Sequence, residues 1–185
     1  MDNVYENNYQ YSNEFNLITQ MKSWMAINPS FGCIYDCAYC IQHKDKYYDA
    51  AIQGEIHKAK NNGTVYTPED VVLEIMKHPR IKRNTPLVFY NFSDPLLPQN
   101  IRDLEKILTG LDENKLTNIV GLITRTFTGM HFLDNLAKLQ YLRPIVLISY
   151  AGYTNTLIEN SSLKKRVELA RALCERKIKV IQYLR

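Results

Sequence analysis

The chain has 185 residues, of which 45% are hydrophobic and 23% charged, and its formal net charge is +4 at pH 7. This length suits one domain with a substantial buried core, and the composition is ordinary for a soluble globular protein. Lysine and arginine are spread along the chain, so the charge permits an acidic partner without indicating a nucleic-acid binder. No apolar run approaches the ~18 residues of a membrane span, so no membrane partner is expected.

The first 20 residues are acidic and polar and contain no apolar segment of the kind found in signal peptides. We therefore interpret residues 1–20 as a polar N-terminal extension and residues 21–185 as a single domain. A cytoplasmic location is expected. In that reducing compartment, clustered cysteines are typical of metal binding or reactivity rather than of disulfides.

From residue 22 onward, strand and helix patterns alternate. Continuous apolar runs predict five strands, at 22–28, 86–92, 118–124, 144–150 and 178–185. Apolar residues at helical spacing predict helices at 67–78, 100–110, 130–140 and 161–177.

Two of these helices carry more specific signals. Thr67, Pro68 and Asp70 form a capping-box pattern with proline in the first turn. The last helix has one apolar side, and we predict that this side packs against the core. The residues of that side are Leu163, Val167, Ala170 and Cys174. Cys174 is accordingly expected to be a small buried residue.

Apolar strands separated by helices predict an α/β protein with a parallel sheet covered on both faces. Two architectures fit this pattern, an open doubly wound sheet and an incomplete β/α barrel. Both place their chemistry beyond the carboxyl ends of the strands. Polar residues occur at these strand ends, and we expect them to converge on one rim. They are Cys33, Cys37, Cys40, Asn91, Ser93, Asp94, Thr124, Arg125, Ser149, Tyr150 and Arg185.

The stretch "SFGCIYDCAYCIQHK", residues 30–44, places Cys33, Cys37 and Cys40 within eight positions. Three thiolates at this spacing can wrap a [4Fe–4S] cubane, which needs four cysteines for full ligation. One iron then stays open to another ligand. A zinc site completed by His43 is the alternative, although structural zinc ligands usually form two separated pairs.

The C-x3-C-x2-C spacing, with Tyr39 before the last cysteine, resembles the signature of the radical S-adenosylmethionine (SAM) superfamily. The segments "NPSFGCIYDCAYC", "FSDPLLPQ", "ITRTF" and "LISY" resemble, in the same order, spore photoproduct lyase and its relatives. The resemblance covers roughly residues 24–185. It implies a partial (β/α)6 barrel of which about five βα units are present and the C-terminal unit is missing.

The same resemblance implies a cofactor pair and a chemistry. A [4Fe–4S] cluster would be held by Cys33, Cys37 and Cys40, and its open iron would bind the amino and carboxylate groups of SAM. Reductive cleavage of SAM gives a 5′-deoxyadenosyl radical that abstracts hydrogen from a substrate, while the protein supplies position and electrostatics. An external flavodoxin- or ferredoxin-like electron donor is implied.

Five SAM contacts follow from the resemblance, residue by residue. "NFSD" (91–94) stands where the family has a glycine-rich segment ending in an acid, and Arg125 stands where lyase-like members often carry lysine. The implied SAM contacts are Tyr39, Ser93, Asp94, Arg125 and Ser149. Arg166 and Glu159 are further candidates for the same pocket. No catalytic residue is assigned.

The substrate is not readable from the sequence. Spore photoproduct lyase acts on a thymine dimer in DNA, so the resemblance makes nucleic acid a substrate class to consider. Residues 41–66, which include the basic and aromatic stretch "HKDKYY", are the expected substrate-facing insertion. Two other functions stay open at this point: a zinc-binding interaction module, and a truncated, inactive SAM-binding domain.

Overall fold

The computed structural model describes residues 16–35, 37, 40, 57–127, 129–150 and 162–184. Its main feature is a six-stranded sheet with the order β1-β2-β7-β8-β9-β10. The strands are β1 (Ile18–Gln20), β2 (Met25–Ile27), β7 (Leu87–Phe89), β8 (Ile119–Thr124), β9 (Arg143–Tyr150) and β10 (Lys179–Leu184). The edge strand β1 is antiparallel to β2, and every other neighbouring pair is parallel.

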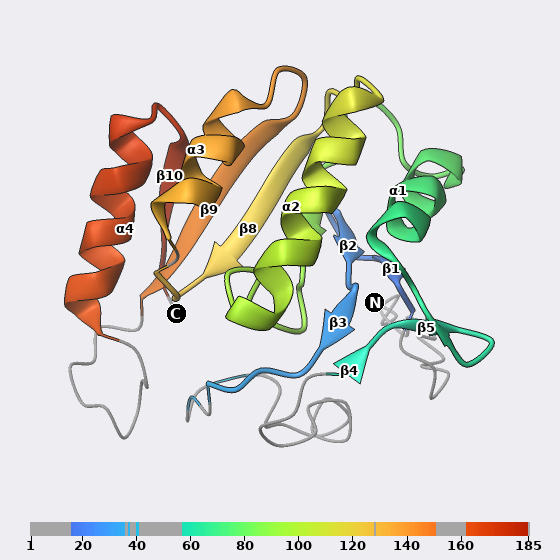
Figure 1. The fold of residues 1–185 in the computed structure, drawn as a ribbon, viewed down its shortest axis with the longest axis horizontal. Helices are drawn as coiled ribbons and strands as arrows, with labels where there is room; N and C mark the ends of the chain where they lie inside the picture. Colours follow the sequence, from blue (N-terminus) through green and yellow to red (C-terminus); the bar gives the residue numbers. More distant parts are fainter. Residues whose placement is uncertain are drawn as a thin grey trace, which may run out of the picture.

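Four helices occur in the described part of the chain, and Figure 1 shows all of them on one face of this sheet. They are α1 (Pro68–Lys77), α2 (Pro98–Glu113), α3 (Met130–Lys138) and α4 (Leu163–Glu175). The sequence predicted cover on both faces, and for the described residues that prediction is wrong.

The parallel strands follow one another across the sheet in chain order, without a reversal. A doubly wound sheet reverses its strand order at a switch point and has helices on both faces, whereas β/α barrels wind in one direction with helices outside. Of the two architectures that the sequence left open, the described residues therefore favour the barrel type. A missing C-terminal unit stays a prediction.

The core lies between the sheet and the helices. Because successive strand side chains point to opposite faces, β7 directs Leu87 and Phe89 toward the helices, where both are fully buried. Val120, Leu122 and Val146 do the same on the next two strands. The alternate residues face the other side of the sheet and are only half-buried there; they include Val88, Ile123 and Leu147.

The beginning of the domain differs from the prediction. The first parallel strand is shorter than residues 22–28, because a turn in which the Met21 N–H donates to the Trp24 carbonyl at 2.9 Å precedes β2. The sequence did not predict β1, which lies inside the segment interpreted as an extension. The domain boundary itself stays a prediction.

The predicted core face of the last helix is wrong. Leu163 and Val167 are 38% and 42% exposed, and Cys174 is exposed rather than buried. α4 instead packs through a neighbouring stripe, with Leu169 and Leu173 fully buried. The larger side chains of that stripe bury more apolar area than alanine and cysteine can, so the helix is rotated toward them.

Four short strands form two small separate sheets. β3 (Ser30–Phe31) pairs antiparallel with β4 (His57–Lys58), and β5 (Lys60–Asn61) pairs with β6 (Thr64–Val65). Of the predicted insertion 41–66, residues 57–66 are described and contain β4, β5 and β6, whereas residues 41–56 lie outside the described residues. Among the described helices, none has the length and apolar character needed to cross a membrane.

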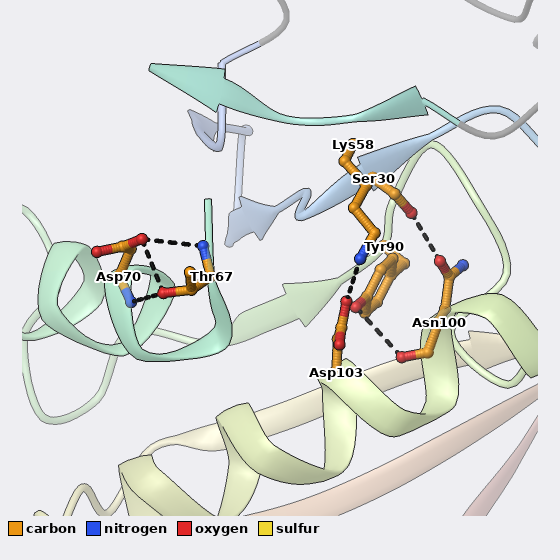
Figure 2. Close-up of polar contacts among 7 residues, drawn as sticks. All are labelled: Ser30, Lys58, Thr67, Asp70, Tyr90, Asn100 and Asp103. Atoms are coloured by element: carbon orange, nitrogen blue, oxygen red, sulfur yellow. Dashed lines mark hydrogen bonds and ion pairs between the residues drawn. The ribbon is translucent and has the colours of Figure 1, made fainter. Parts of the chain in front are cut away.

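The predicted cap of α1 is confirmed (Figure 2). Thr67 Oγ1 accepts a hydrogen bond from the Asp70 N–H at 3.1 Å, and Asp70 Oδ2 accepts from the Thr67 N–H at 2.9 Å. The Thr67 N–H, together with the Thr67 hydroxyl, which donates to Asp70 Oδ2 at 2.7 Å, holds the pKa of the Asp70 carboxyl below its ordinary value. A carboxyl whose pKa is lowered by folding stabilises the fold above its unfolded pKa, and loses this contribution as the pH falls through the lower, folded value.

We expect Thr67→Ala to reduce the free energy of unfolding by about 1 kcal/mol near neutral pH, because the first turn loses its cap. The loss should shrink as the pH falls below about 4, the ordinary Asp value, and should be smallest below the lower folded pKa, where Asp70 of the wild type is protonated and the capping box is weakened there as well. Urea denaturation at both pH values measures this. Thr64→Ala, at an exposed threonine of β6, is the control, and an equal loss there would contradict the prediction.

Candidate functional site

A cavity of about 320 Å³ lies where the carboxyl ends of the central strands meet the cysteine segment. Its wall combines thiols, hydroxyls, a carboxylate and a guanidinium. The polar residues that matter most are Cys33, Cys40, Ser93, Asp94, Arg125 and Ser149. The expected convergence of strand-end residues on one place is therefore present, although the function of each residue stays a prediction.

A tight turn after β7 brings one side of the wall into place. Tyr90 has a φ of 55°, an uncommon conformation for a bulky residue, and its carbonyl accepts a hydrogen bond from the Ser93 N–H at 2.9 Å. The Tyr90 ring is buried, and its hydroxyl donates to the Asn100 carbonyl at 3.4 Å (Figure 2). Backbone strain of this kind clusters at functional sites, where the surrounding structure holds it in place.

The Asp94 carboxylate joins this turn to the end of β8. Its Oδ1 accepts from the Thr124 hydroxyl at 2.6 Å and from the Leu96 N–H at 3.0 Å, and its Oδ2 accepts from the Arg125 N–H at 3.0 Å. Asp94 is only 4% exposed. Burial raises the pKa of Asp94, and the hydrogen bonds from Thr124, Arg125 and Leu96 act in the opposite direction.

The cysteine segment is anchored on the same turn. Gly32, with a φ of 85°, precedes Cys33, and its N–H donates to the Phe92 carbonyl at 3.0 Å. This left-handed conformation favours glycine, since a β-carbon would be strained there. The rings of Phe31 and Phe92 stack with their centroids 6.2 Å apart. The start of the cysteine loop therefore has a fixed position relative to Ser93 and Asp94.

The three clustered cysteines differ in their surroundings. Cys33 and Cys40 line the cavity, whereas Cys37 is buried and accepts a hydrogen bond from Arg125 Nη1. Burial raises the pKa of Cys33 to about 12, with the nearby Asp94 carboxylate adding to the effect. Cys33 is therefore a neutral thiol in this state, and metal binding there would release a proton.

Among the described residues, no group of three or more histidine, cysteine, aspartate or glutamate side chains lies close enough to hold a metal ion. A [4Fe–4S] cluster makes a different demand, because each thiolate binds a separate iron. The donor set suits such a cluster, since thiolates are the ligands of iron–sulfur clusters and two of these thiols border the cavity. Ligation by Cys33, Cys37 and Cys40 stays a prediction.

Ser149 adds a hydroxyl from β9. Its Oγ is buried, faces the cavity region and has no hydrogen-bond partner in the described part of the chain. Buried hydroxyls are nearly always hydrogen-bonded, so this one is suited to a ligand. Arg166, a further candidate from the sequence, is buried behind the strand, where it donates to the Ser149 carbonyl at 3.0 Å.

Some predicted positions fall outside the described residues, namely Tyr39, His43, Glu159 and Arg185. The sequence also missed residues at the site. Asn100 contacts both Ser93 and Asp94, yet a polar residue in the first turn of a helix carries no signal of burial. Trp24 lines the cavity from the segment before β2, and its only signal is that it is the single tryptophan of the chain.

No protein-family model matches the sequence, and no curated protein matches it. Among solved structures, spore photoproduct lyase complexed with dinucleoside spore photoproduct is 18% identical, with a TM-score of 0.66 over 92% of this chain and 48% of that chain. A mutant of this lyase with bound AdoMet and the same dinucleoside gives the same values. SuiB from Streptococcus suis, bound to S-adenosylmethionine, is 15% identical, with a TM-score of 0.56 over 84% of this chain and 32% of that chain.

At this level of identity the comparisons establish the fold alone. The structural neighbours are radical SAM enzymes, so the likeness to that superfamily inferred from the cysteine motif is confirmed at the level of structure. The chain spans about half the length of the spore photoproduct lyase it resembles.

We expect Asp94→Ala to reduce the free energy of unfolding by at least about 3 kcal/mol, because each of the three donors left unpaired in a buried place costs about 1–3 kcal/mol. Chemical denaturation measures the loss. Asp134→Ala is the matched control, since the Asp134 carboxylate is half exposed and its ion pair with Arg176 should contribute about 1 kcal/mol or less. Equal effects of the two substitutions would contradict the structural role given to Asp94.

Proposed function

We propose that this chain is a radical SAM enzyme that binds a [4Fe–4S] cluster and S-adenosylmethionine and abstracts hydrogen from a substrate. The observation that carries the proposal is the shared cavity: thiols of the C-x3-C-x2-C motif and polar groups suited to an amino acid line the same space at the carboxyl ends of parallel strands. The fold of the structural neighbours, which include proteins with bound AdoMet, supports it.

Cys33, Cys37 and Cys40 would hold the cluster. When bound together, the cluster and SAM supply a 5′-deoxyadenosyl radical, and the protein provides position and exclusion of water. The Arg125 guanidinium beside Cys37 places a positive charge at one ligand sulfur. Such a charge would stabilise the thiolate form that the cluster requires.

The cavity wall matches the amino-acid part of SAM in charge. Asp94 offers a carboxylate oxygen to an ammonium group, while Ser93, Ser149 and Arg125 offer hydrogen-bond donors to a carboxylate or to ribose hydroxyls. We therefore propose Ser93, Asp94, Arg125 and Ser149 as SAM contacts. Tyr39, from the cysteine motif itself, completes the proposed set.

The substrate class is proposed from the neighbours alone. Spore photoproduct lyase is recorded in complex with a dinucleoside spore photoproduct, which makes a nucleic acid the first substrate to test. A flavodoxin- or ferredoxin-like donor would supply the electron, and the cytoplasm is the proposed location. The exposed Leu163 and Val167 on α4, beside the edge strand β10, support the proposal of a further βα unit that would pack there.

Anaerobic reconstitution with ferrous iron and sulfide should give a brown protein with about four irons and four sulfides per chain. Cys37→Ala should lose most of this iron, because only two thiolates of the motif would then remain to hold the cluster. Cys174→Ala should keep it, because Cys174 is exposed on α4 and far along the chain from the motif. A colourless protein holding one zinc ion would overturn the proposal, and so would equal iron loss in both variants.

The reconstituted protein, reduced with dithionite and supplied with SAM, should form methionine and 5′-deoxyadenosine in equal amounts. Chromatography of the quenched reaction measures both products. Arg125→Met should lower this activity at least tenfold, while Arg143→Met, at an exposed arginine of β9, should leave it unchanged. If the iron-loaded wild type forms no 5′-deoxyadenosine, the chain is a SAM-binding domain without radical chemistry.

A further inference from the structure

Asn100 is a buried polar residue in the first turn of α2, and it takes no direct part in the proposed chemistry. It is 3% exposed, and its side-chain amide contacts two separate segments of the chain, β3 and the Ser93–Asp94 turn. Its Oδ1 accepts from the Ser30 hydroxyl at 2.8 Å, as Figure 2 shows. Its Nδ2 donates to Ser93 Oγ at 3.0 Å and to the Asp94 carbonyl at 2.8 Å. All the hydrogen-bonding capacity of the Nδ2 group is thereby used.

The orientation of this amide is determined by its partners. A backbone carbonyl can only accept a hydrogen bond, so the group that faces the Asp94 carbonyl must be the NH2 side of Asn100. The second hydrogen of that NH2 group points to Ser93 Oγ. Ser93 must therefore accept in this contact, and its own hydroxyl hydrogen is directed elsewhere.

That hydrogen has no acceptor in the described part of the chain, and Ser93 lines the cavity. Next to it, Asp94 Oδ1 already accepts two hydrogen bonds, whereas Oδ2 accepts one, from the Arg125 N–H. A carboxylate oxygen has two acceptor sites, so Oδ2 retains one. The turn thus presents a hydroxyl donor beside a carboxylate acceptor.

We propose that Asn100 is a positioning residue that fixes Ser93 as a hydrogen-bond donor, so that Ser93 binds the carboxylate of the amino-acid part of SAM while Asp94 Oδ2 binds its ammonium group. This inference rests on the proposed SAM binding. The ammonium and carboxylate groups of an α-amino acid are attached to the same carbon. Two neighbouring side chains such as Ser93 and Asp94 can therefore bind both groups of one molecule. If Ser93 instead donated its hydrogen to another group of the protein, the carboxylate of SAM would face a lone pair of Ser93 Oγ and would receive no hydrogen bond from it.

The same helix supplies a matched control. Asp103, one turn further along α2, binds Lys58 of β4 at 2.8 Å (Figure 2). Asn100 and Asp103 therefore both attach α2 to the small β3–β4 sheet that flanks the cysteine segment. Only Asn100 also contacts Ser93. A substitution at Asp103 loosens the same attachment without changing the direction of the Ser93 hydroxyl.

The test compares the affinity of the iron-loaded protein for SAM with its affinity for decarboxylated SAM, which lacks the carboxylate, by equilibrium dialysis. The wild type should prefer SAM. Ser93→Ala should reduce this preference roughly tenfold to a hundredfold, the value of a hydrogen bond to a charged group. Asn100→Asp and Asn100→Ala should reduce it by a similar factor, the double variant Ser93→Ala/Asn100→Ala should lose nothing more, and Asp103→Asn should keep the wild-type preference.

A merely structural role would change both affinities together and leave their ratio unchanged, so an unchanged ratio in the Asn100 variants overturns the inference. If those variants do not fold, Ser93→Ala provides the test, because the half-buried Ser93 side chain can be shortened without exposing the core. An unchanged ratio in Ser93→Ala also overturns the inference. A loss of the ratio in Asp103→Asn would also overturn the inference. A wild type that binds neither compound overturns the proposed function and this inference with it, a result distinct from SAM binding without discrimination.

Discussion

The buried carboxylate of Asp94 is the interaction on which the site depends. It takes hydrogen bonds from the Thr124 hydroxyl and from two backbone N–H groups, and so holds the turn after β7 against the end of β8. A buried charge is stable only when its hydrogen bonds are satisfied, and here the backbone supplies most of them. These hydrogen bonds offset the cost of burying Asp94, and they fix the shape of one wall of the cavity.

A second constraint comes from the direction in which the chain winds. Since every parallel strand adds to the same side of its predecessor and the helices lie on one face, polar residues at successive strand ends meet around one space. The opposite face of the sheet is left partly exposed in the described residues, as the half-buried Val88, Ile123 and Leu147 indicate. These side chains of the sheet line the cavity, so the sheet both positions the polar residues at its strand ends and forms one side of the cavity.

Much of this arrangement could be predicted from local sequence patterns. The apolar runs placed β8 and β9 within one residue of their observed limits, and Thr67 with Asp70 marked the start of α1. Long-range features could not be predicted in this way. Cys37 and Arg125 are 88 positions apart, and their contact depends on the complete fold. β1 has three residues, too few to form a period.

The error at α4 has a physical cause of general interest. Two stripes of the helix are apolar enough to face a core, and the packing of Leu169 and Leu173 decided between them, leaving Val167 and Cys174 exposed. The burial of Asn100 was missed for the opposite reason: asparagine in a helical pattern is normally solvated, so nothing in the sequence indicated that it would be buried. Its burial became evident only from its partners Ser30 and Ser93.

We propose that the cysteine loop and the Ser93–Asp94 turn bind one ligand in one cavity. The most direct measurement is electron–nuclear double resonance of the reduced, anaerobically reconstituted protein with SAM labelled with nitrogen-15 in its amino group and oxygen-17 in its carboxylate. Hyperfine coupling of both labels to the cluster is expected if SAM binds there. A cluster signal with no coupling to either label would contradict it.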